Sequence, residues 1–213
     1  MDGTLADTLT DIAYAANHAL ELQSFPTWSV DEYRQKVGYG MRELCRRALP
    51  EELRMDEAAV DKMMSMFDSY YREHCCVRTE LFPGIRELLD KLHEAGIMCA
   101  IITNKSAVQT GIVLDELFKP DDFIYVKGLT DQNYKKPDPR LFYDCMKALS
   151  VSPEETVYVG DSDVDVIFAC NAGVDSVGAA WGIRGRAELE AAGATFTADT
   201  ADEVYRFITG KQI

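Results

Sequence analysis

The sequence predicts an α/β protein with a doubly wound, Rossmann-type parallel sheet and a helical domain inserted near its N-terminus. From Phe82 onward, short apolar runs rich in β-branched residues alternate with helical patterns, which is typical of buried parallel strands joined by crossover helices. Between residues 9 and 79, by contrast, the regular patterns are helical. We therefore expect residues 1–8 and 80–213 to form an α/β core domain, and residues 9–79 to form a helical cap over the strand tips.

Local patterns predict the individual elements. The cap helices carry apolar residues at helical spacing and are expected at residues 5–22, 42–49 and 57–74. Ser29 and Glu32 have the spacing of a capping box and predict one further helix start. In the core, residues 85–95 predict a helix that is ended by Gly96. The core strands are apolar runs and are expected at residues 99–102, 123–126, 156–159 and 176–178.

The length and composition agree with a soluble enzyme. The chain has 213 residues, 47% of them hydrophobic, and a formal net charge of −14. This acidity disfavours nucleic acid and anionic membranes as partners, since both select basic patches. No apolar run approaches the roughly 18 residues of a membrane span. The six cysteines contain no C-x-x-C pair, which favours reduced thiols and a cytoplasmic location. Monomer and homodimer both remain open.

A cluster of carboxylates after a predicted strand indicates a cation site. The apolar run ends at Gly160-Asp161, and Asp163 and Asp165 follow closely. In open α/β sheets, ligands bind at the carboxyl ends of the strands, and neighbouring carboxylates repel one another unless a cation neutralises them. For Asp161, at the strand tip, we favour a hard cation such as Mg²⁺. For Asp163, a favourable interaction with the N-terminus of the next helix is sufficient.

Two further segments place polar groups close to strand ends. The strand predicted near residue 102 is followed by Thr103 and Asn104, a hydroxyl and an amide that would also suit an ordinary helix N-cap. Lys136 lies in the segment Lys-Lys-Pro-Asp-Pro. Its two prolines favour a rigid placement of the Lys136 ammonium over a solvated loop, because each proline restricts its own backbone and that of the preceding residue.

The N-terminal segment Asp2-Gly3-Thr4 is by itself a common turn sequence. It also matches the second half of a D-x-D-G-T phosphotransfer loop, with Met1 between the two carboxylate positions. The first Asp of such a loop attacks phosphorus, and it has no counterpart in the sequence. We expect it just before Met1, at the end of an apolar strand. The strands ending near residues 103 and 161 should then be about 9–10 Å apart, twice the usual spacing, and should not pair with each other.

Taken together and in this order, the four segments resemble the haloacid dehalogenase (HAD) superfamily of phosphohydrolases, over nearly the whole chain. The resemblance implies Mg²⁺ as cofactor and hydrolysis of a phosphate ester through an aspartyl-phosphate. It implies Asp2 as general acid/base. For catalysis it implies Asp2 and Lys136, and for phosphate binding it implies Gly3, Thr103, Asn104 and Lys136. For Mg²⁺ it implies Asp161 and the backbone carbonyl of Asp2 as ligands. Asp165 would be either a further ligand or a hydrogen-bond partner of the ligands.

The cap should carry the choice of substrate, since the phosphate machinery is common to all substrates. Gly38-Tyr39-Gly40 precedes a helix that contains Arg46, and the two could bring backbone amides and a cation to an anionic substrate. An ordinary turn with solvated arginines explains this segment equally well. Gly38-Tyr39-Gly40 and Trp181-Gly182 resemble the phosphoglycolate phosphatase branch of the family, which implies 2-phosphoglycolate as the favoured substrate.

Other functions remain as alternatives. A sugar-phosphate mutase would share the fold and all four motifs, and it would need a bisphosphorylated activator. A dehalogenase is disfavoured, because it has no leaving alkoxide for Asp2 to protonate. A non-catalytic phosphate-binding protein is the alternative if Met1 is the natural start of the chain.

Overall fold

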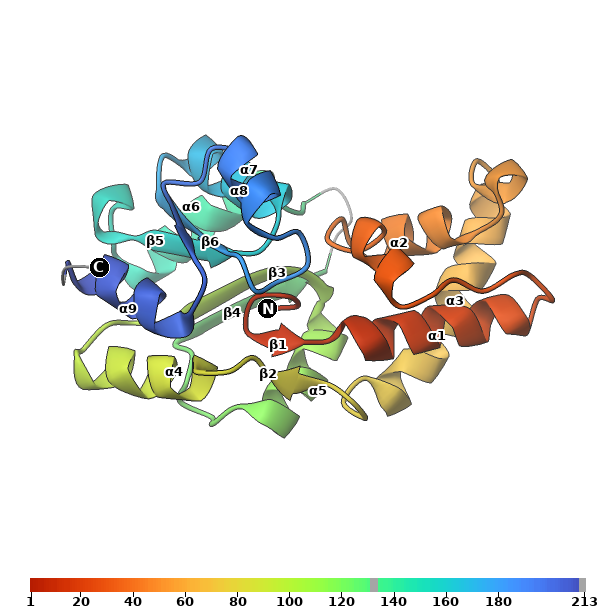
Figure 1. Ribbon diagram of the computed structural model, residues 1–213, viewed down its shortest axis with the longest axis horizontal. Coiled ribbons are helices and arrows are strands. Elements are labelled where there is room, and N and C mark those ends of the chain that lie inside the picture. The colour runs from red at the N-terminus through yellow and green to blue at the C-terminus, as the bar shows by residue number, and fades with distance from the viewer. Residues whose placement is uncertain (131–133, 211–213) are drawn as a thin grey trace.

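The computed structural model describes residues 1–130 and 134–210, which form an α/β part and a helical part (Figure 1). Strand β1 (Ala6–Asp7) leads into the helical part, and β2 (Glu80–Leu81) leads out of it; the two strands pair antiparallel. The elements between them are α1 (Leu9–Glu21), η1 (Asp31–Gln35), α2 (Met41–Ala48), η2 (Glu51–Leu53) and α3 (Glu57–His74). We call residues 9–79 the cap and the remainder the core. Whether each folds as a separate domain stays a prediction.

The core alternates strands and helices, as the sequence predicts. Its strands are β3 (Ala100–Ser106), β4 (Tyr125–Leu129), β5 (Val157–Gly160), β6 (Asp175–Ala179) and β7 (Phe196–Ala198). Its helices are α4 (Ile85–Glu94), α5 (Ala107–Leu117), α6 (Arg140–Leu149), α7 (Asp163–Ala172), α8 (Arg186–Ala191) and α9 (Ala201–Thr209), with the short η3 (Pro153–Glu155) before β5. Strand β3 pairs parallel with β4, and β5, β6 and β7 form a parallel sheet in that order.

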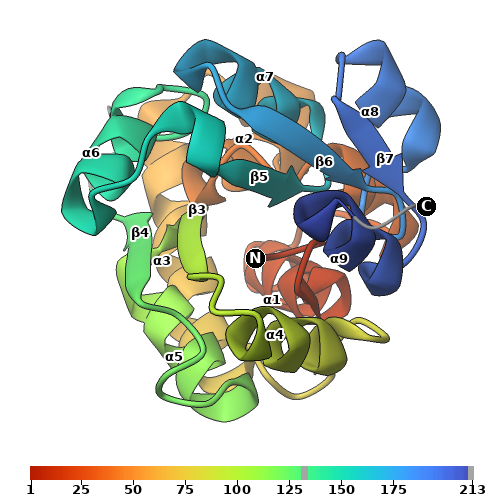
Figure 2. The ribbon, with the colours of Figure 1, turned by 90° about the vertical axis from the view of Figure 1, so that its left-hand side faces the viewer.

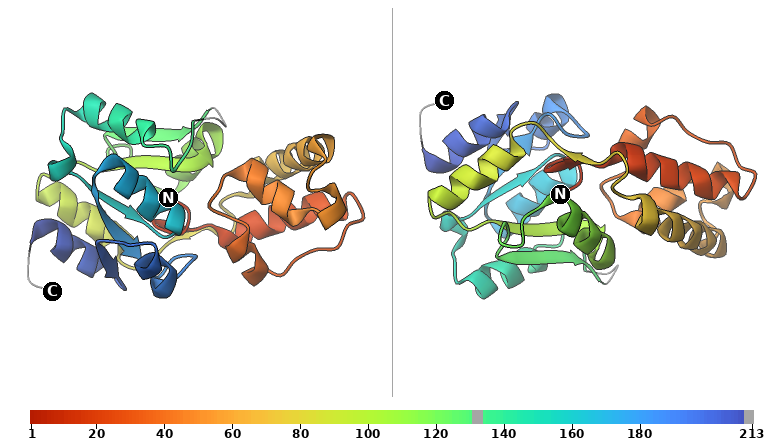
Figure 3. Two further views of the ribbon diagram at one scale, coloured as in Figure 1. Left: turned by 90° about the horizontal axis from the view of Figure 1, so that it is seen from above. Right: turned by 90° about the horizontal axis from the view of Figure 1, so that it is seen from below.

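Helices cover the core strands on both faces (Figure 2). On one face, α4 and α9 pack against β6 and β7, where Ile85 and Val204 join Val177 in one apolar cluster. On the other face, α6 and α7 contribute Phe142 and Phe168 to a second cluster. This arrangement confirms the predicted doubly wound α/β fold. Seen from above and below, the cap lies beyond the ends of the strands on one side of the core (Figure 3).

Strands β3 and β5 belong to different sheets and do not pair with each other. Met1 lines the same pocket as Thr103, on β3, and Asp161, directly after β5. Figure 2 shows the N-terminal end of the chain between these parts of the core. The absence of direct pairing agrees with the expectation from the sequence, while the width of the separation stays a prediction.

Some predicted boundaries are wrong for identifiable reasons. The first helix begins at Leu9 instead of residue 5, because residues 1–6 form a hydrogen-bonded turn and Ala6 pairs with β2. The capping box forms, with Ser29 N donating to Glu32 Oε2 over 2.8 Å, but it precedes a short 3₁₀ helix and not an α-helix. Strand β3 runs through Thr103 to Ser106, beyond the predicted end at residue 102.

Two observations bear on the environment of the chain. No helix in the described segments combines the length and the apolar character that crossing a membrane requires. The six cysteines are free thiols, and even the adjacent Cys75 and Cys76 have sulfur atoms 3.8 Å apart, beyond bonding distance. A cytoplasmic location stays a prediction.

Candidate active site

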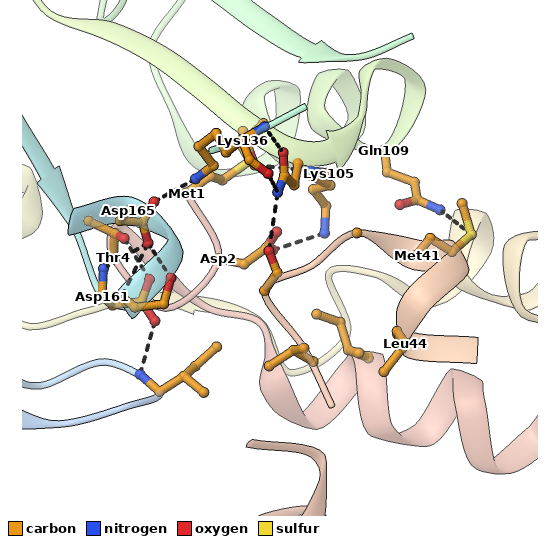
Figure 4. A pocket seen from close by; sticks show the side chains of 18 of the residues that line it. Met1, Asp2, Thr4, Met41, Leu44, Lys105, Gln109, Lys136, Asp161 and Asp165 are labelled. Carbon is orange, nitrogen blue, oxygen red and sulfur yellow. Dashed lines mark hydrogen bonds and ion pairs between the residues drawn. The ribbon is translucent and has the colours of Figure 1, made fainter. Parts of the chain in front are cut away.

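One pocket at the junction of core and cap collects most of the predicted site residues (Figure 4). Its walls come from the ends of β3 and β5, the loop before α6, the N-terminal segment and the cap. The predicted residues that line it are Asp2, Gly38, Gly40, Thr103, Asn104, Lys136, Asp161 and Asp165. The parallel strands bring these residues together because their carboxyl ends lie at one edge of the core.

Asp161 is a buried carboxylate with neutral hydrogen-bond partners. Its Oδ1 accepts from Thr4 Oγ1 over 2.9 Å, and its Oδ2 accepts from the backbone N–H of Ile183 over 3.1 Å. Burial, together with the nearby Asp165 charge, raises the pKa of Asp161 to about 6. Gly3 packs directly on Asp161: its φ is +75°, and a Cβ at this position would lie 2.1 Å from Asp161 Oδ2. Gly3 therefore leaves room for the carboxylate but does not itself line the pocket.

Asp165 and Lys136 form a buried ion pair beside Asp161. Lys136 Nζ lies 2.6 Å from Asp165 Oδ1 and 3.1 Å from Tyr158 Oη. The other oxygen, Asp165 Oδ2, accepts hydrogen bonds from the backbone N–H groups of Asp161 and Ser162 and from the Ser162 hydroxyl. Burial would raise the pKa of Asp165, but the Lys136 charge outweighs it and holds the pKa below its ordinary value. Asp165 thus positions Lys136 and the strand end, and direct metal ligation by it stays a prediction.

Asp2 is held by a lysine that the sequence patterns did not single out. Lys105 Nζ donates to Asp2 Oδ1 over 2.9 Å and to Tyr71 Oη of the cap over 2.7 Å. Burial would raise the pKa of Asp2, yet the Lys105 charge prevails and lowers it. The Asp2 carboxylate therefore faces the pocket in its ionised form.

Thr103 and Asn104 lie side by side on β3 with different surroundings. Thr103 Oγ1 accepts from the backbone N–H of Lys105 over 3.1 Å, which leaves the hydroxyl hydrogen able to donate into the pocket. Asn104 Oδ1 accepts from the Lys136 backbone N–H over 2.9 Å, and Asn104 Nδ2 donates to the carbonyls of Gly38 and Lys136 over 3.2 Å each. Asn104 thus fixes the Lys136 loop and joins it to the cap, while phosphate binding by its side chain stays a prediction.

The predicted specificity residues of the cap separate into two groups. Gly38 and Gly40 line the pocket, whereas Tyr39 and Arg46 do not. Tyr39 Oη donates to Asp163 Oδ2 over 3.2 Å and so links cap to core. Arg46 donates to Glu57 and to a backbone carbonyl within the cap. A role for Arg46 in binding substrate has no support in its contacts and stays a prediction.

The donor set of the pocket fits a hard divalent cation. The described residues contain no cluster of three His, Cys, Asp or Glu side chains arranged around a metal. Mg²⁺ is usually held by only one or two carboxylates, together with water and substrate phosphate. Asp161 suits this role, because a cation beside it would relieve the cost of its burial and of the Asp165 charge.

Lys105, Tyr71 and Arg184 also line the pocket, and the sequence patterns did not predict them as site residues. The sequence does indicate a site role for Lys105, since it follows the predicted site residues Thr103 and Asn104 directly. It gives no such indication for Tyr71 and Arg184, because their place in the pocket depends on how the cap docks and on the loop after β6.

The chain matches known proteins over nearly its full length. The family model described as haloacid dehalogenase-like hydrolase matches residues 1–179. A phosphoglycolate phosphatase of Vibrio parahaemolyticus is 31% identical over 212 residues, covering 98% of this chain and 93% of the relative. A phosphoglycolate phosphatase of Colwellia psychrerythraea is 32% identical over 213 residues, covering 96% and 92%.

Solved structures agree with this relationship. A protein from Lactobacillus delbrueckii subsp. bulgaricus superimposes with a TM-score of 0.89 at 29% identity, covering 98% of this chain and 95% of that one. A predicted phosphoglycolate phosphatase from Haemophilus somnus gives a TM-score of 0.89 at 26% identity, covering 97% and 94%. The chain therefore belongs to the haloacid dehalogenase-like hydrolases, beside relatives named phosphoglycolate phosphatase, which confirms the family and the enzyme class, phosphoric monoester hydrolase, predicted from the sequence.

Proposed function

We propose that the protein is a Mg²⁺-dependent phosphatase of a small phosphorylated metabolite, with 2-phosphoglycolate as the favoured substrate. The observation that carries this proposal is the convergence of Thr103, Lys136 and Asp161 on one pocket together with Asp2. Phosphoryl transfer needs mainly positioning and charge stabilisation around the moving oxygens. The buried ammonium of Lys136, the hydroxyl of Thr103 and the cation-binding carboxylate of Asp161 supply this positioning and charge stabilisation.

Asp2 is the proposed general acid/base. Its carboxylate is ionised in the resting site, since Lys105 holds its pKa below the ordinary value. Asp2 would protonate the departing alkoxide and then accept a proton from the attacking water, a role worth roughly 10²–10⁴-fold in rate. The attacking carboxylate that the family resemblance implies is not among the 213 residues, so roles are assigned only to the residues present.

Lys136 and Thr103 are the proposed phosphate ligands. Lys136 Nζ has two of its three protons on Asp165 and Tyr158, which leaves the third for a phosphoryl oxygen. Asp161, with the backbone carbonyl of Asp2, would hold Mg²⁺. When bound, the cation neutralises charge on the transferring group.

The substrate assignment rests on two supports. Relatives that cover most of this chain are named phosphoglycolate phosphatase. The cap also lines the pocket at Gly38, Leu44 and Tyr71, so the substrate lies between cap and core, which favours a small ester over a polymer.

An assay of the natural full-length protein tests the proposal. We expect release of inorganic phosphate from 2-phosphoglycolate in the presence of Mg²⁺, at a higher kcat/KM than for other phosphorylated metabolites. Undiminished turnover in excess chelator would contradict the metal requirement. Equal kcat/KM across a panel of esters would contradict the substrate assignment. A requirement for a bisphosphorylated activator would favour the mutase instead.

A further inference from the structure

Three cationic side chains line the pocket, and one of them is not neutralised by a buried carboxylate. Lys105 is paired with Asp2, and Lys136 is paired with Asp165. Arg184, from the loop between β6 and α8, has only 3% of its side-chain surface exposed. Its acidic partner is Glu188, at 3.3 Å, whose side chain is 38% exposed. Burying a guanidinium costs free energy unless the group is paired, so this placement requires an explanation.

Arg184 also retains hydrogen-bonding capacity. A guanidinium has five N–H groups in a planar fork. Its Nε faces Glu188, one Nη1 proton goes to Gln35 Oε1 over 2.8 Å, and one Nη2 proton goes to the Val37 carbonyl over 3.2 Å. One proton on each terminal nitrogen has no partner in the described segments. N–H groups on neighbouring guanidinium nitrogens are the donors that bind a carboxylate through both of its oxygens.

The guanidinium borders the open space at Gly38, in the pocket that Asp2 and Asp161 also line. Gly38 lines the pocket, and a Cβ at this position would meet a single protein atom within 4 Å, Arg184 Nη2 at 4.0 Å. The residue before Arg184 donates its backbone N–H to Asp161 Oδ2 over 3.1 Å. Consecutive Cα atoms are only about 3.8 Å apart, so the loop that carries Arg184 adjoins the proposed metal carboxylate.

The arginines of the cap are occupied elsewhere. Arg42 pairs with Glu57 and Asp61, Arg46 with Glu57, and Arg47 with Glu43. None of these three lines the pocket, and among the described residues that do, Arg184 is the only arginine.

We propose that Arg184 of the core, and not an arginine of the cap, binds the carboxylate of the substrate and so gives the enzyme its preference for phosphorylated carboxylic acids over neutral phosphate esters. This inference rests on the proposed function, because it assumes a phosphoryl group beside Asp161 and Lys136.

Two non-hydrolysable phosphonates test the inference by calorimetry in the presence of Mg²⁺. 3-Phosphonopropionate has the shape of 2-phosphoglycolate with its carboxylate, and propylphosphonate replaces that carboxylate by a methyl group. We expect the wild type to bind 3-phosphonopropionate roughly ten- to hundredfold more tightly, the range of a hydrogen bond between charged groups. In Arg184→Gln this ratio should fall to about one, while the affinity for propylphosphonate is retained. Arg184→Lys should keep part of the ratio, since lysine keeps the positive charge but lacks the planar pair of N–H donors of a guanidinium.

Arg34→Gln is the matched control. Arg34 lies in the cap, reaches the same loop through the carbonyls of Gly182 and Ile183, and does not line the pocket. It should leave the ratio unchanged. An equal loss of both phosphonates in Arg184→Gln would overturn the inference and make Arg184 a brace between cap and core. An unchanged ratio in Arg184→Gln would overturn it as well. If the folded wild type binds neither phosphonate, the proposed function fails together with the inference.

Discussion

At the scale of single residues, Asp161 is a buried carboxylate whose hydrogen-bond partners are neutral. Its exposed fraction is 4%, its partners are a hydroxyl and an amide, and a second carboxylate lies close by. These surroundings raise the pKa of Asp161 to about 6, so its protonated form is favoured only below about pH 6. Substitution of Asp161 should therefore change both the pH dependence of protein stability and the dependence of activity on Mg²⁺.

We predict that Asp161→Asn flattens the pH dependence of stability between pH 4 and 6. The ordinary pKa of Asp is 3.8, and the folded value is raised to about 6. Between these values the native state binds more protons than the unfolded chain, so the free energy of unfolding falls as pH rises, by up to about 3 kcal/mol. Urea titrations without divalent cations should show this fall in the wild type and a smaller one in the variant. The same slope in both proteins would contradict the raised pKa.

A second prediction separates two neighbouring carboxylates. Asp161→Asn should weaken the dependence of activity on Mg²⁺ far more than Asp163→Asn, because Asp163 lies outside the pocket lining and contacts Tyr39 of the cap. The measurement is the Mg²⁺ concentration that gives half-maximal activity. Similar shifts in the two variants would mean that the metal assignment is wrong.

Lys136→Met should destabilise the fold as well as impair phosphate binding. It would leave Asp165 buried without its cation, and breaking a buried pair in this way costs about 3–5 kcal/mol. Lys135→Met is the neighbouring control, because Lys135 donates only to the Tyr39 carbonyl and forms no ion pair in the described residues. Urea unfolding of both variants measures the difference. A loss below about 1 kcal/mol for Lys136→Met would show that the pair is not important for stability.

At the scale of elements, the return of the chain from cap to core is fixed by Asp11 in the first turn of α1. Asp11 Oδ2 accepts from the backbone N–H groups of Arg78 and Thr79, and from the Thr79 hydroxyl, over 2.8–2.9 Å. Asp11 is 3% exposed and Thr79 is buried, so the two hydrogen bonds from Thr79 lie away from water, while the one from Arg78 is partly buried. One carboxylate thereby ties the end of the cap to its beginning, next to the pair of β1 and β2.

We predict that Asp11→Ala releases residues 78 and 79. Each buried donor left without an acceptor costs about 1–3 kcal/mol. Amide hydrogen exchange at Arg78 and Thr79 should accelerate more than exchange in α3, and the free energy of unfolding should fall. Asp7→Ala serves as control, because Asp7 is exposed and accepts only a long bond of 3.4 Å from Leu9 N. Unchanged exchange at both amides would refute the proposed tie.

The sequence predicts those elements whose pattern is long enough to show a period. α3 was predicted with its observed bounds, Glu57–His74, because its apolar face repeats over several turns. β1, β2 and β7 were missed, since strands of two or three residues show no alternation. The predicted end of β3 at residue 102 is too early because Thr103 and Asn104 resemble an N-cap locally, whereas the strand continues through a shift in register and pairs with β4 again at Ser106.

The same limit applies to the site. Thr103 and Asp161 can be predicted because each follows the apolar pattern of a buried strand, and Lys136 because two prolines restrict the backbone around it. Tyr71 and Arg184 reach the pocket through contacts between distant parts of the chain, which no local pattern encodes. Arg46 was selected for its charge, but its nearest carboxylates lie within the cap.

At the scale of the whole molecule, the pocket joins core and cap through several independent contacts. Lys105 of the core donates to Tyr71 of the cap, and Gln109 of α5 donates to Asp68 of α3 over 2.9 Å. Asn104 reaches the carbonyl of Gly38 in the same way. A ligand in the pocket therefore contacts both parts and should stabilise both together.

We predict that 3-phosphonopropionate with Mg²⁺ slows amide exchange in α3 as well as in β3. At a ligand concentration one hundred times Kd, the free energy of unfolding should rise by about 2.7 kcal/mol. Hydrogen exchange followed by mass spectrometry gives the protection of each segment. Protection confined to the core would show that cap and core respond separately.

The antiparallel pair of β1 and β2 has a consequence for how such a protein can be re-engineered. Ala6 lies opposite Leu81, and Asp7 opposite Glu80, so the chain leaves the core and rejoins it at adjacent points. The stability of the core should therefore depend little on the length of a segment inserted between β1 and β2, because the entropic cost of closing a loop rises only slowly with loop length. Arg184 stays behind in such an exchange. A foreign insert grafted at this junction would change the shape of the pocket and remove the Gln35 and Val37 contacts of Arg184, so the insert would need to supply two acceptors to keep a preference for carboxylates.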